Sequence, residues 1–478
     1  MDNSTNPGFA IVAALEPAHA RLKRAWQADA FPEYEQRIAL LDKLARMLHA
    51  HEDDWIAAIN ADFGQRSAVE TRLAELFPSQ EGIRHAKKML KRWMAPQKRG
   101  VSLWFKPARA HVRAQPLGVV GIIVPWNYPL YLAVGPMIAA LAAGNRIMLK
   151  MSEFTPHTGE LMARLCLEAL GADWVEVVNG GPEVAAAFSA LPFDHLLFTG
   201  STAIGKHVMR AAAANLTPVT LELGGKSPAI VAPGFDVRRA AEAIVVGKML
   251  NAGQTCVAPD YVLVKAGERD ALVREIRLAA SRMYPTLRDN PDYTSVVNAR
   301  HHQRLSLWLE EARSAGATVE AINPGAEDLS GSHKLPLTLI SDAPPDCALM
   351  QEEIFGPLLP IVAYGKFDEA LDYVNARARP LALYLFDEDP MRIARVERET
   401  IAGGMCVNTT VLHVAQDDLP FGGVGASGMG HYHAHEGFLT FSKLKPVLAM
   451  PKLNVLSLTH APYGQRMHWL LKLMLRRP

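Results

Sequence analysis

The chain has 478 residues, which at roughly 150 residues per domain predicts two or three domains with sizeable cores. Hydrophobic residues make up 49% of it and charged residues 21%, and both values are ordinary for a globular protein. The net charge of +1 provides no bulk attraction to nucleic acid or to an anionic membrane, so neither is expected as a partner.

The N-terminus does not have the features of a secretory signal. It lacks a basic start, and Glu16 and Pro17 interrupt its apolar run. No stretch of about 18 apolar residues exists, so stable membrane insertion is not expected. The four cysteines form no CxxC pair and no segment has metal-ligand spacing, so neither a disulfide framework nor a metal site is predicted. These features favour a cytoplasmic protein in a reducing compartment.

Residues 11–95 have the periodicity of helices. Within Ala39–Phe63, apolar residues recur at helical spacing and charged residues fill the other face. We expect a packed helical hairpin that carries no chemistry of its own.

From Gly118 onward, buried strands alternate with helices. Strands are expected at 118–124, 146–150, 175–179, 195–199 and 219–223, with helices at 130–143, 156–170, 183–190 and 203–214. Such alternation predicts a parallel sheet with crossover helices, which binds ligands at the carboxyl ends of its strands. A second α/β domain is expected from Ser227 to roughly Asn408. The two domains meet near Glu222–Lys226, so a cleft between them should carry Glu222 on its wall.

Two stretches at strand ends could hold a dinucleotide. In FTGSTAIG (Phe198–Gly205) a strand runs into a glycine, a serine and a helix start, and helix N-termini bind phosphate. A tight turn with Ser201 as N-cap explains this stretch equally well. In LKMSE (Leu149–Glu153), Lys150 and Glu153 stand where such a sheet holds a ribose. Taken locally, a surface ion pair with a helix cap explains them better.

Two further stretches bring polar side chains to the same edge. The prolines of PWNYP (Pro125–Pro129) fix Asn127, whose amide could donate to an oxyanion or form an Asx-turn. In LELGGKSP (Leu221–Pro228), Glu222 lies in an apolar strand, where burial raises a carboxyl pKa and suits a general base. A buried structural carboxylate is the alternative.

Cys256 stands in the loop NAGQTCVAP, between a helix that ends near Asn251 and a strand that Pro259 delays. It lies on neither a helix face nor a strand face, so regular core packing does not explain it. A thiol near backbone dipoles could ionise and attack a substrate. This segment alone supports a packing role and a nucleophilic role for Cys256 equally. The other cysteines are predicted to be packing residues: Cys166, Cys347 and Cys406.

Taken together and in order, these motifs resemble the aldehyde dehydrogenase superfamily. The matching stretches are PWNYP, LKMSE, FTGS, LELGGKSP, GQTC, EEIFGPLLP (Glu352–Pro360) and LPFGGVGASGMG (Leu419–Gly430), within about residues 20–450. The stretches GQTCVAPDY, NPDYTSVVNARH and DLPFGGVGASGMGHYH also resemble the coniferyl-aldehyde dehydrogenase group, which is allied to the class 3 and fatty aldehyde enzymes.

The resemblance implies NAD(P)-dependent oxidation of an aldehyde to the acid through a thiohemiacetal and a thioester. An aromatic aldehyde such as coniferaldehyde is the first expectation, and a medium-chain or long-chain aliphatic aldehyde is the second. Cys256 would be the nucleophile, Glu222 the general base and Asn127 the oxyanion donor. NAD is the expected cofactor, and NADP is compatible. The cofactor-binding residues would be Lys150, Glu153, Gly200, Ser201, Gly205, Glu353 and Phe355.

Two positions depart from the family pattern. Met151 replaces the usual proline, which should loosen the turn that holds Glu153 and weaken a strict preference for NAD. Thr409 follows Asn408 where class 3-like members often carry aspartate, which should change the polarity of the substrate side.

The resemblance also implies two doubly wound parallel-sheet domains with a small β oligomerisation arm. Residues 1–98 and 116–223 would form the NAD-binding domain and 224–412 the catalytic domain, with the arm at 99–115 and 431–455 and a tail at 456–478. A homodimer or tetramer is expected, in which Thr440–Leu448 could add a strand to a partner's sheet. The apolar and basic run His468–Arg477 should pack on the body or on a partner subunit rather than on a membrane surface.

Two alternatives remain open. Acyl transfer to coenzyme A could replace hydrolysis, although the presence of Glu222 favours water as the acceptor. A non-catalytic binding or structural protein on the same scaffold would be expected to have lost Cys256 or Glu222, and both are present.

Overall fold

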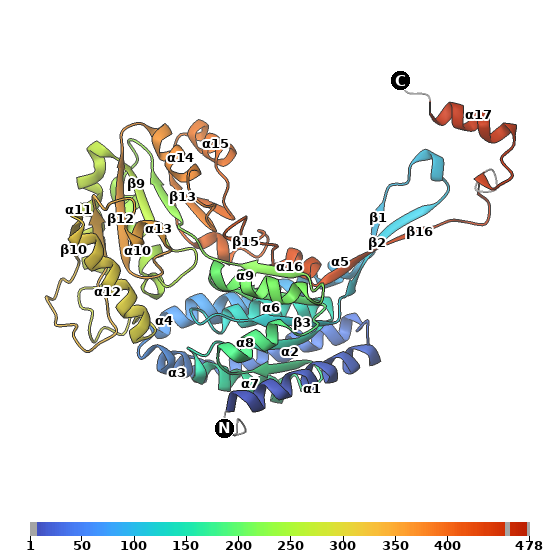
Figure 1. Ribbon diagram of the computed structural model, residues 1–478, viewed down its shortest axis with the longest axis horizontal. Coiled ribbons are helices and arrows are strands. Elements are labelled where there is room, and N and C mark those ends of the chain that lie inside the picture. The colour runs from blue at the N-terminus through green and yellow to red at the C-terminus, as the bar shows by residue number, and fades with distance from the viewer. Residues whose placement is uncertain (1–6, 455–458, 476–478) are drawn as a thin grey trace.

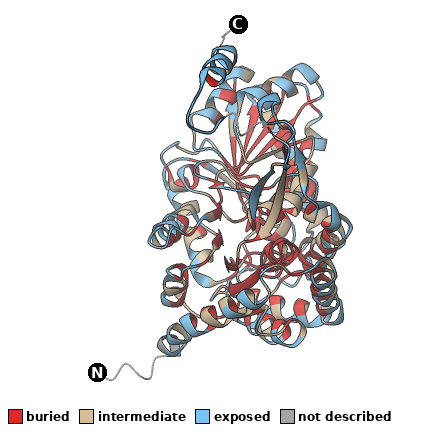
Figure 2. Cartoon of the chain, turned by 90° about the vertical axis from the view of Figure 1, so that its right-hand side faces the viewer, coloured by how far each residue is buried: buried red, intermediate tan, exposed pale blue. Residues whose placement is uncertain are grey.

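The computed structural model describes residues 7–454 and 459–475. Two large α/β units lie side by side, and a small antiparallel sheet projects away from them as an arm (Figure 1). Buried residues concentrate in the two units, whereas the arm is largely exposed or half-buried (Figure 2). The predicted fold class, two parallel-sheet domains with a small β arm, is confirmed.

The first sheet has six strands in the order β15-β7-β6-β3-β4-β5, and all but β15 run parallel. Every residue of its central strands is buried, as expected for a parallel sheet covered by helices on both faces. The strands are β3 (Val119–Ile123), β4 (Arg146–Lys150), β5 (Val175–Val178), β6 (His195–Thr199), β7 (Val219–Glu222) and β15 (Gly428–Met429). The crossover helices are α6 (Tyr131–Ala143), α7 (Pro156–Ala169), α8 (Pro182–Ser189) and α9 (Thr202–Ala213).

The N-terminal region is more elaborate than the predicted helical hairpin. It contains α1 (Pro7–Ala28), α2 (Tyr34–Ala50), α3 (Glu52–Phe63), α4 (Ala68–Thr71), a π-helical turn (Arg72–Leu76) and α5 (Phe77–Met94). Helices α2 and α5 pack against α6, whereas α1 packs against α8 and on β3, β4 and β5. Gly64 ends α3 in the left-handed conformation, with φ of 71°, and turns the chain toward the centre of the molecule.

The second sheet has seven strands in the order β10-β11-β12-β9-β8-β13-β14, and only β10 runs antiparallel. Its strands are β8 (Pro228–Val231), β9 (Tyr261–Lys265), β10 (Thr318–Ala321), β11 (Thr338–Ser341), β12 (Leu358–Tyr364), β13 (Ala382–Phe386) and β14 (Gly404–Val407). The helices around it are α10 (Val237–Met249), α11 (Arg269–Met283), α12 (Ala299–Ser314), α13 (Ala348–Gln351), α14 (Phe367–Asn375) and α15 (Pro390–Glu399).

The small sheet consists of β1 (Gln97–Arg99), β2 (Arg109–Pro116) and β16 (Ser442–Ala449), all paired antiparallel. Most of the segment that was expected to reach a partner's sheet, Thr440–Leu448, therefore pairs with β2 of its own chain, from Ser442 onward. Helix α16 (Ala434–Thr440) precedes β16 and packs against α5 and α6.

Helix α17 (Gln465–Met474) stands apart from both large units, beyond the arm (Figure 1). The expectation that the tail packs on the body is therefore wrong for the single chain, and contact with a partner subunit stays a prediction. Trp469 on this helix is 67% exposed, which agrees with a helix that makes few contacts. Residues 476 and 477 of the basic run lie outside the described residues.

Candidate active site

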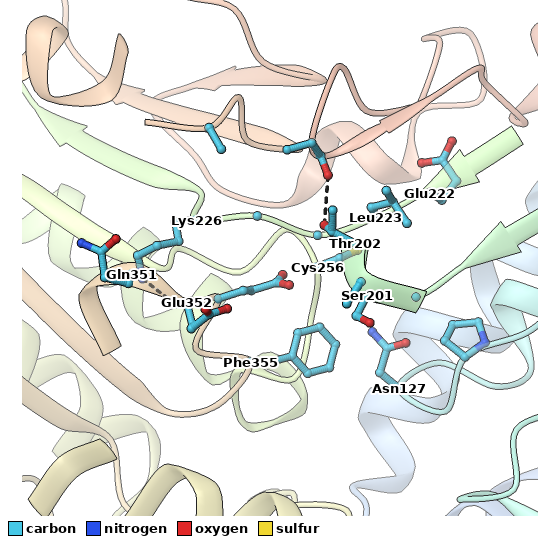
Figure 3. A pocket seen from close by; sticks show the side chains of 18 of the residues that line it. Asn127, Ser201, Thr202, Glu222, Leu223, Lys226, Cys256, Gln351, Glu352 and Phe355 are labelled. Atoms are coloured by element: carbon cyan, nitrogen blue, oxygen red, sulfur yellow. Dashed lines mark hydrogen bonds between the residues drawn. The ribbon is translucent and has the colours of Figure 1, made fainter. Parts of the chain in front are cut away.

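A pocket of about 930 Å³ opens between the two large units, at the carboxyl ends of β6 and β7. Ligand-binding pockets commonly have volumes of about 300–1,000 Å³. Figure 3 shows the side chains around it. The predicted site residues in its lining are Asn127, Gly200, Ser201, Glu222, Cys256, Glu353 and Phe355. The predicted residues outside its lining are Lys150, Glu153 and Gly205.

A strained backbone presents Cys256 to this pocket. After α10 the chain passes through Asn251 and Ala252, both with φ near the left-handed region, at 53° and 52°. Gly253 follows with φ of 73°, and a Cβ there would come within 2.4 Å of the Gly356 carbonyl oxygen. Only glycine therefore fits where these two loops meet. The sharp turn removes Cys256 from any helix or strand face, as the sequence predicted.

The Cys256 thiol is free and half-buried. Burial raises the pKa of this thiol to about 12, with further contributions from the carboxyls of Glu353 and Glu222. Backbone dipoles alone therefore do not ionise the thiol. Backbone N–H groups do lower the pKa, but burial and the two carboxyls outweigh them. A base must accept the thiol proton when the sulfur attacks.

Asn127 follows β3 and is attached to the loop that carries Cys256. Its Nδ2 donates to the Gln254 carbonyl at 3.1 Å, and its own carbonyl accepts a 2.9 Å hydrogen bond from Asn251 Nδ2. These bonds reach across to the Cys256 loop and do not form a local Asx-turn, and the role of oxyanion donor stays a prediction. The amide faces the pocket in Figure 3.

A buried ion pair beneath Asn127 was not predicted from the sequence. Arg66 pairs with Glu75 at 3.4 Å, and both side chains are fully buried. Arg66 also donates a 2.8 Å hydrogen bond to the Asn127 carbonyl. Glu75 accepts hydrogen bonds of 2.8 and 3.1 Å from the N–H groups of Leu130 and Tyr131, where α6 begins. The N-terminal helices thus hold the turn that carries Asn127.

Glu70 extends this buried cluster to the nucleophile loop. Its carboxylate accepts a 3.0 Å hydrogen bond from the Asn251 N–H and a 2.5 Å hydrogen bond from the Thr294 hydroxyl. Burial raises the pKa of Glu70 above its usual value. The only sequence signal for these residues was a charge-rich stretch after Gly64, which also fits an ordinary solvent-exposed helix face.

Glu222 ends β7 and is 2% exposed. Neither of its carboxylate oxygens has a hydrogen-bond partner in the described part of the chain. Burial without a partner raises the pKa of Glu222 well above its usual range. A purely structural carboxylate would be hydrogen-bonded, so the missing partners speak against that alternative, and the role of general base stays a prediction. In Figure 3 the carboxylate is turned away from Cys256.

The loop Glu352–Phe355 is held by an ion pair between the half-buried Lys226 and the buried Asp260. Lys226 also donates a 2.9 Å hydrogen bond to the Glu352 carbonyl, which Figure 3 marks with a dashed line. On the other side, Asp260 accepts a 2.9 Å hydrogen bond from the Ile354 N–H. The ion pair therefore joins the LELGGKSP stretch to the predicted nicotinamide side of the pocket.

Glu353 and Phe355 lie on that loop. A Cβ at Gly224 would come within 2.0 Å of a Glu353 carboxylate oxygen, so the glycine makes room for this carboxylate. Burial raises the pKa of Glu353 to about 8. Phe355 has a left-handed φ of 50°, and its ring contacts Trp126 edge-on with 5.3 Å between ring centres.

Helix α9 begins at the pocket. The Ser201 hydroxyl accepts a 3.4 Å hydrogen bond from the Ile204 N–H, so the predicted N-cap role is confirmed. Ser201 and Thr202 both line the pocket, so the helix N-terminus also faces it, as a phosphate site requires. Gly205 has a packing role, because a Cβ there would come within 2.7 Å of Leu223.

Lys150 and Glu153 form an ion pair of 3.7 Å at the end of β4. Lys150 is 2% exposed and donates a 2.7 Å hydrogen bond to the Met151 carbonyl. Met151 is fully buried in the core. The ion pair is present, but Lys150 is buried rather than on the surface, and Thr155, the N-cap of α7, makes no side-chain hydrogen bond. The alternative of a surface ion pair with a helix cap is therefore only partly correct, and the ribose-binding role stays a prediction.

The remaining expectations concern cysteines, metals and membranes. The other three cysteines are free and buried, as packing residues should be: Cys166, Cys347 and Cys406. Within residues 7–454 and 459–475, no cluster of histidine, cysteine or acidic side chains could hold a metal ion. No described helix is long and apolar enough to cross a membrane.

Comparison with known proteins agrees with this site. The sequence profile of the aldehyde dehydrogenase family matches residues 10–447. A probable coniferyl aldehyde dehydrogenase of Pseudomonas aeruginosa is 53% identical over 451 residues, which cover 94% of each chain. A coniferyl aldehyde dehydrogenase of a Pseudomonas species is 46% identical over 96% of each chain.

Solved structures give the same result. The substrate-bound state of Staphylococcus aureus AldH matches with a TM-score of 0.90 at 37% identity, covering 96% of this chain and 99% of that one. A Mycobacterium tuberculosis aldehyde dehydrogenase complexed with NAD+ matches with a TM-score of 0.83 at 27% identity, covering 93% and 92%. The chain therefore belongs to the aldehyde dehydrogenase family and is an aldehyde dehydrogenase enzyme, as its ordered motifs predicted.

Proposed function

We propose that this chain oxidises an aldehyde to the carboxylic acid with NAD or NADP, through a covalent adduct on Cys256. The observation that carries the proposal is the convergence of Cys256, Asn127 and Glu222 on one pocket between the two large units. These side chains supply the nucleophile, the oxyanion donor and the base that the reaction needs.

In the first step the Cys256 sulfur attacks the aldehyde carbon and a C–S bond forms. The carbonyl oxygen becomes an oxyanion, which the Asn127 amide and the Cys256 N–H stabilise. Because the thiol pKa is about 12, the thiol proton must pass to a base during the attack. We assign this transfer to Glu222, which lines the same pocket and whose carboxylate must turn toward Cys256 to receive the proton.

The residues present fit a nicotinamide cofactor. Gly224 leaves room for the Glu353 carboxylate, which would accept hydrogen bonds from ribose hydroxyls, and Phe355 would contact the ring. Ser201 and Thr202 at the start of α9 would face the pyrophosphate together with Gly200. When bound, the oxidised nicotinamide accepts the hydride that the tetrahedral adduct releases, which leaves a thioester on Cys256.

At the adenosine end we assign Lys150 and Glu153 to the ribose. The Glu153 carboxylate would accept hydrogen bonds from ribose hydroxyls and would repel a 2′-phosphate, which favours NAD. Gly205 would allow α9 to pack closely on the sheet beside the pyrophosphate. The ion pair of 3.7 Å between Lys150 and Glu153 supports a common role for the two residues.

Hydrolysis of the thioester completes the reaction. The proton that Glu222 took from the thiol first passes to solvent, which restores the carboxylate. Glu222 then accepts a proton from water as the water oxygen attacks the thioester carbon. The C–S bond then breaks, the carboxylic acid leaves, and Cys256 is restored. The raised pKa of Glu222 suits this work, because a base near neutrality accepts a proton more readily than an ordinary carboxylate.

For the substrate we favour coniferaldehyde or a related aromatic aldehyde. The support is the identity of 46–53% to proteins named coniferyl aldehyde dehydrogenase. The test is reduced-cofactor formation by purified protein with coniferaldehyde, benzaldehyde and hexanal, each with NAD and with NADP. Fastest turnover with coniferaldehyde and the free acid as product supports the proposal. Preference for hexanal would refute the aromatic assignment, and a product that forms only with coenzyme A would refute hydrolysis.

We further propose a cytoplasmic homodimer or tetramer with the domain bounds given above. Four free cysteines support a reducing compartment. The projecting sheet supports assembly, because Leu444 and Leu448 on β16 are 41% and 58% exposed in the single chain. Light scattering of the full chain and of a chain ending at residue 464 would measure the assembly and the contribution of α17 to it.

A further inference from the structure

Gln254 stands two positions before Cys256, and the mechanism above does not use it. Its side chain is fully buried, and its hydrogen bonds all go to backbone groups. The amide nitrogen donates 3.0 Å hydrogen bonds to the carbonyls of Asn251 and Ser295. The amide oxygen accepts a 2.9 Å hydrogen bond from the Val297 N–H. The side chain therefore ties the nucleophile loop to residues that stand 41 and 43 positions further along the chain.

The backbone carbonyl of the same residue reaches the proposed oxyanion donor. It accepts a 3.1 Å hydrogen bond from Asn127 Nδ2 and a 3.2 Å hydrogen bond from Asn251 Nδ2. A side-chain amide nitrogen carries two hydrogens, so this carbonyl engages one N–H of Asn127 and leaves the other available to a ligand. Asn127 lines the pocket, whereas Gln254 does not. Gln254 thus contacts the oxyanion donor from behind the pocket wall.

The hydrogen bond to this carbonyl decides which way the Asn127 amide faces. If the amide were reversed, its oxygen would replace Nδ2 at 3.1 Å from the Gln254 carbonyl oxygen. Two acceptors cannot form a hydrogen bond with each other, and at that distance they repel. An oxyanion is stabilised by an N–H group and not by an amide oxygen. The position of the Gln254 carbonyl therefore determines whether Asn127 can act as a donor.

The Gln254 carbonyl lies at the end of a turn with an unusual backbone. The three preceding residues have left-handed φ values of 53°, 52° and 73°, at Asn251, Ala252 and Gly253. Such conformations persist in residues other than glycine only where the surrounding structure holds them. The Gln254 side chain provides this support, because it bonds to the first residue of the turn and to a separate segment of the chain. Without these bonds the turn should relax and the carbonyl should move.

We propose that Gln254 is a positioning residue for the oxyanion donor. Its side chain anchors the turn, and its carbonyl then orients the Asn127 amide so that one N–H faces the carbonyl oxygen of the substrate. The proposal rests on the function assigned above and adds a residue to the same site. Loss of the side-chain bonds of Gln254 should slow reactions that place negative charge on a carbonyl oxygen. It should spare reactions of Cys256 that do not.

Two reactions of the Cys256 thiol test this proposal without any cofactor. p-Nitrophenyl acetate acylates a thiol through an oxyanion, whereas iodoacetamide alkylates it without one. Both reactions need the thiol proton to leave, so the ratio of the acylation rate to the alkylation rate reports stabilisation of the oxyanion. In Gln254→Glu the side chain keeps an acceptor for the Val297 N–H but loses the amide donors, and this ratio should fall about tenfold.

A double variant distinguishes positioning from a general disturbance of the site. Asn127→Ala removes the donor and should lower the ratio by about 10²–10³-fold. If Gln254 acts through Asn127, the double variant should have the same ratio as Asn127→Ala alone, because both changes remove one interaction. Losses that multiply in the double variant would overturn the proposal. Equal falls of acylation and alkylation in Gln254→Glu would overturn it as well.

Asn145→Asp is the matched control. Asn145 is also a fully buried amide that bonds to four backbone groups, and it lies at the amino end of β4, away from the pocket. Its oxygen accepts from two N–H groups and its nitrogen donates to two carbonyls, which belong to Leu117, Gly118, Ala140 and Phe441. The change removes amide donors as Gln254→Glu does, so both variants should have lowered thermal midpoints. The ratio in Asn145→Asp should nevertheless equal that of the wild type.

Gln254→Met is the second variant at the proposed position. It removes the same donors without adding a carboxyl group to the interior, so it keeps the test available if Gln254→Glu yields no folded protein. The ratio should fall in this variant by the same factor. A wild-type ratio in Gln254→Met would overturn the proposal.

The same preparations separate this proposal from the proposed function. If the ratio depends on Gln254 as expected but the wild type oxidises no aldehyde, only the proposed function fails. If the wild type oxidises aldehydes and both Gln254 variants have the wild-type ratio, only the role of Gln254 fails. Cys256→Ala, which should abolish acylation and alkylation at this position, verifies that each reaction uses this thiol.

Discussion

The guanidinium of Arg66 donates a 2.8 Å hydrogen bond to the backbone carbonyl of Asn127 while it pairs with Glu75 at 3.4 Å. Both charged side chains are fully buried, so the proposed oxyanion donor depends on an ion pair supplied by the N-terminal helices. Residues 7–94 contribute no side chain to the pocket lining. They act on the reaction through the position of Asn127.

The first prediction concerns this hydrogen bond. Arg66→Lys keeps a positive charge opposite Glu75. It loses the planar guanidinium, whose second N–H group also donates to the Asn127 carbonyl. We expect kcat to fall about tenfold with little change in KM, because misplaced catalytic groups mainly affect the transition state. Steady-state kinetics measure this effect, and a wild-type kcat would show that Asn127 does not need the bond.

Arg66→Met distinguishes an effect on the position of Asn127 from an effect on the stability of the fold. It leaves Glu75 as an unpaired buried charge, and breaking a buried pair in this way costs about 3–5 kcal/mol of stability. Denaturant unfolding should therefore distinguish Arg66→Met from Arg66→Lys. If both variants were as stable as the wild type, the ion pair would not support the fold of this region.

The second prediction concerns the oxyanion donor itself. Asn127→Ala should lower kcat by about 10²–10³-fold, the usual cost of removing one such donor. Alkylation of Cys256 by iodoacetamide forms no oxyanion, so its rate should change little in the same variant. Turnover close to that of the wild type would exclude the role of Asn127, and equal losses in both reactions would indicate a displaced Cys256 loop.

The third prediction concerns Glu222 and pH. Burial raises the pKa of this carboxyl, and only its ionised form accepts a proton. Wild-type deacylation should therefore decline as pH falls through the raised pKa. In Glu222→Gln, acylation should slow and deacylation should nearly stop, so at most about one equivalent of reduced cofactor should form per Cys256.

The residual deacylation of Glu222→Gln provides the control for the pH effect. It should lack the decline at low pH, because the titrating group is gone. Both statements can be tested by measuring single-turnover and steady-state rates across the pH range in which the protein stays folded. Persistence of the same low-pH decline in the variant would assign it to another group, with Glu353 as the first candidate because its pKa is raised to about 8.

The fourth prediction concerns the loop that carries Glu353. Asp260→Asn removes the charge that pairs with Lys226 and weakens the support of the Ile354 N–H. We expect the affinity for NAD to fall about tenfold, since the loop loses a buried charge-assisted contact. Calorimetric titration with NAD measures this change.

A surface pair serves as the control for the fourth prediction. Asp270 pairs with Arg269 at 3.1 Å, but its side chain is 90% exposed. Asp270→Asn should leave NAD affinity unchanged, because exposed pairs contribute little. Equal affinities in the wild type and in Asp260→Asn would mean that the Lys226–Asp260 pair does not position the loop.

The parallel sheet and the pocket could be predicted because their signals are local. Apolar runs, together with the glycines and prolines that end them, predicted the bounds of β3, β4, β6 and β7 to within one residue. Cys256 and Glu222 were identifiable because each stands in a place that periodic packing does not explain. The ordered motifs then specified the family, which the comparisons confirmed.

The rest depends on contacts between distant segments. Arg66 and Asn127 are separated by 61 positions, and Glu70 and Asn251 by 181, so no local pattern relates them. The rise of the Cys256 pKa could not be predicted either, because the burial and the two carboxyls that cause it come from three-dimensional packing.

The most direct test of the central claim is the mass of the protein after reaction. Glu222→Gln is incubated at length with coniferaldehyde and NAD, quenched in acid, digested and examined by mass spectrometry, beside a double variant that also carries Cys256→Ala. Our account predicts a coniferyl-derived acyl group on the peptide that contains Cys256 and no adduct in the double variant. Reduced cofactor without an acyl adduct, or an adduct on another cysteine, would contradict the assignment of Cys256 as the nucleophile.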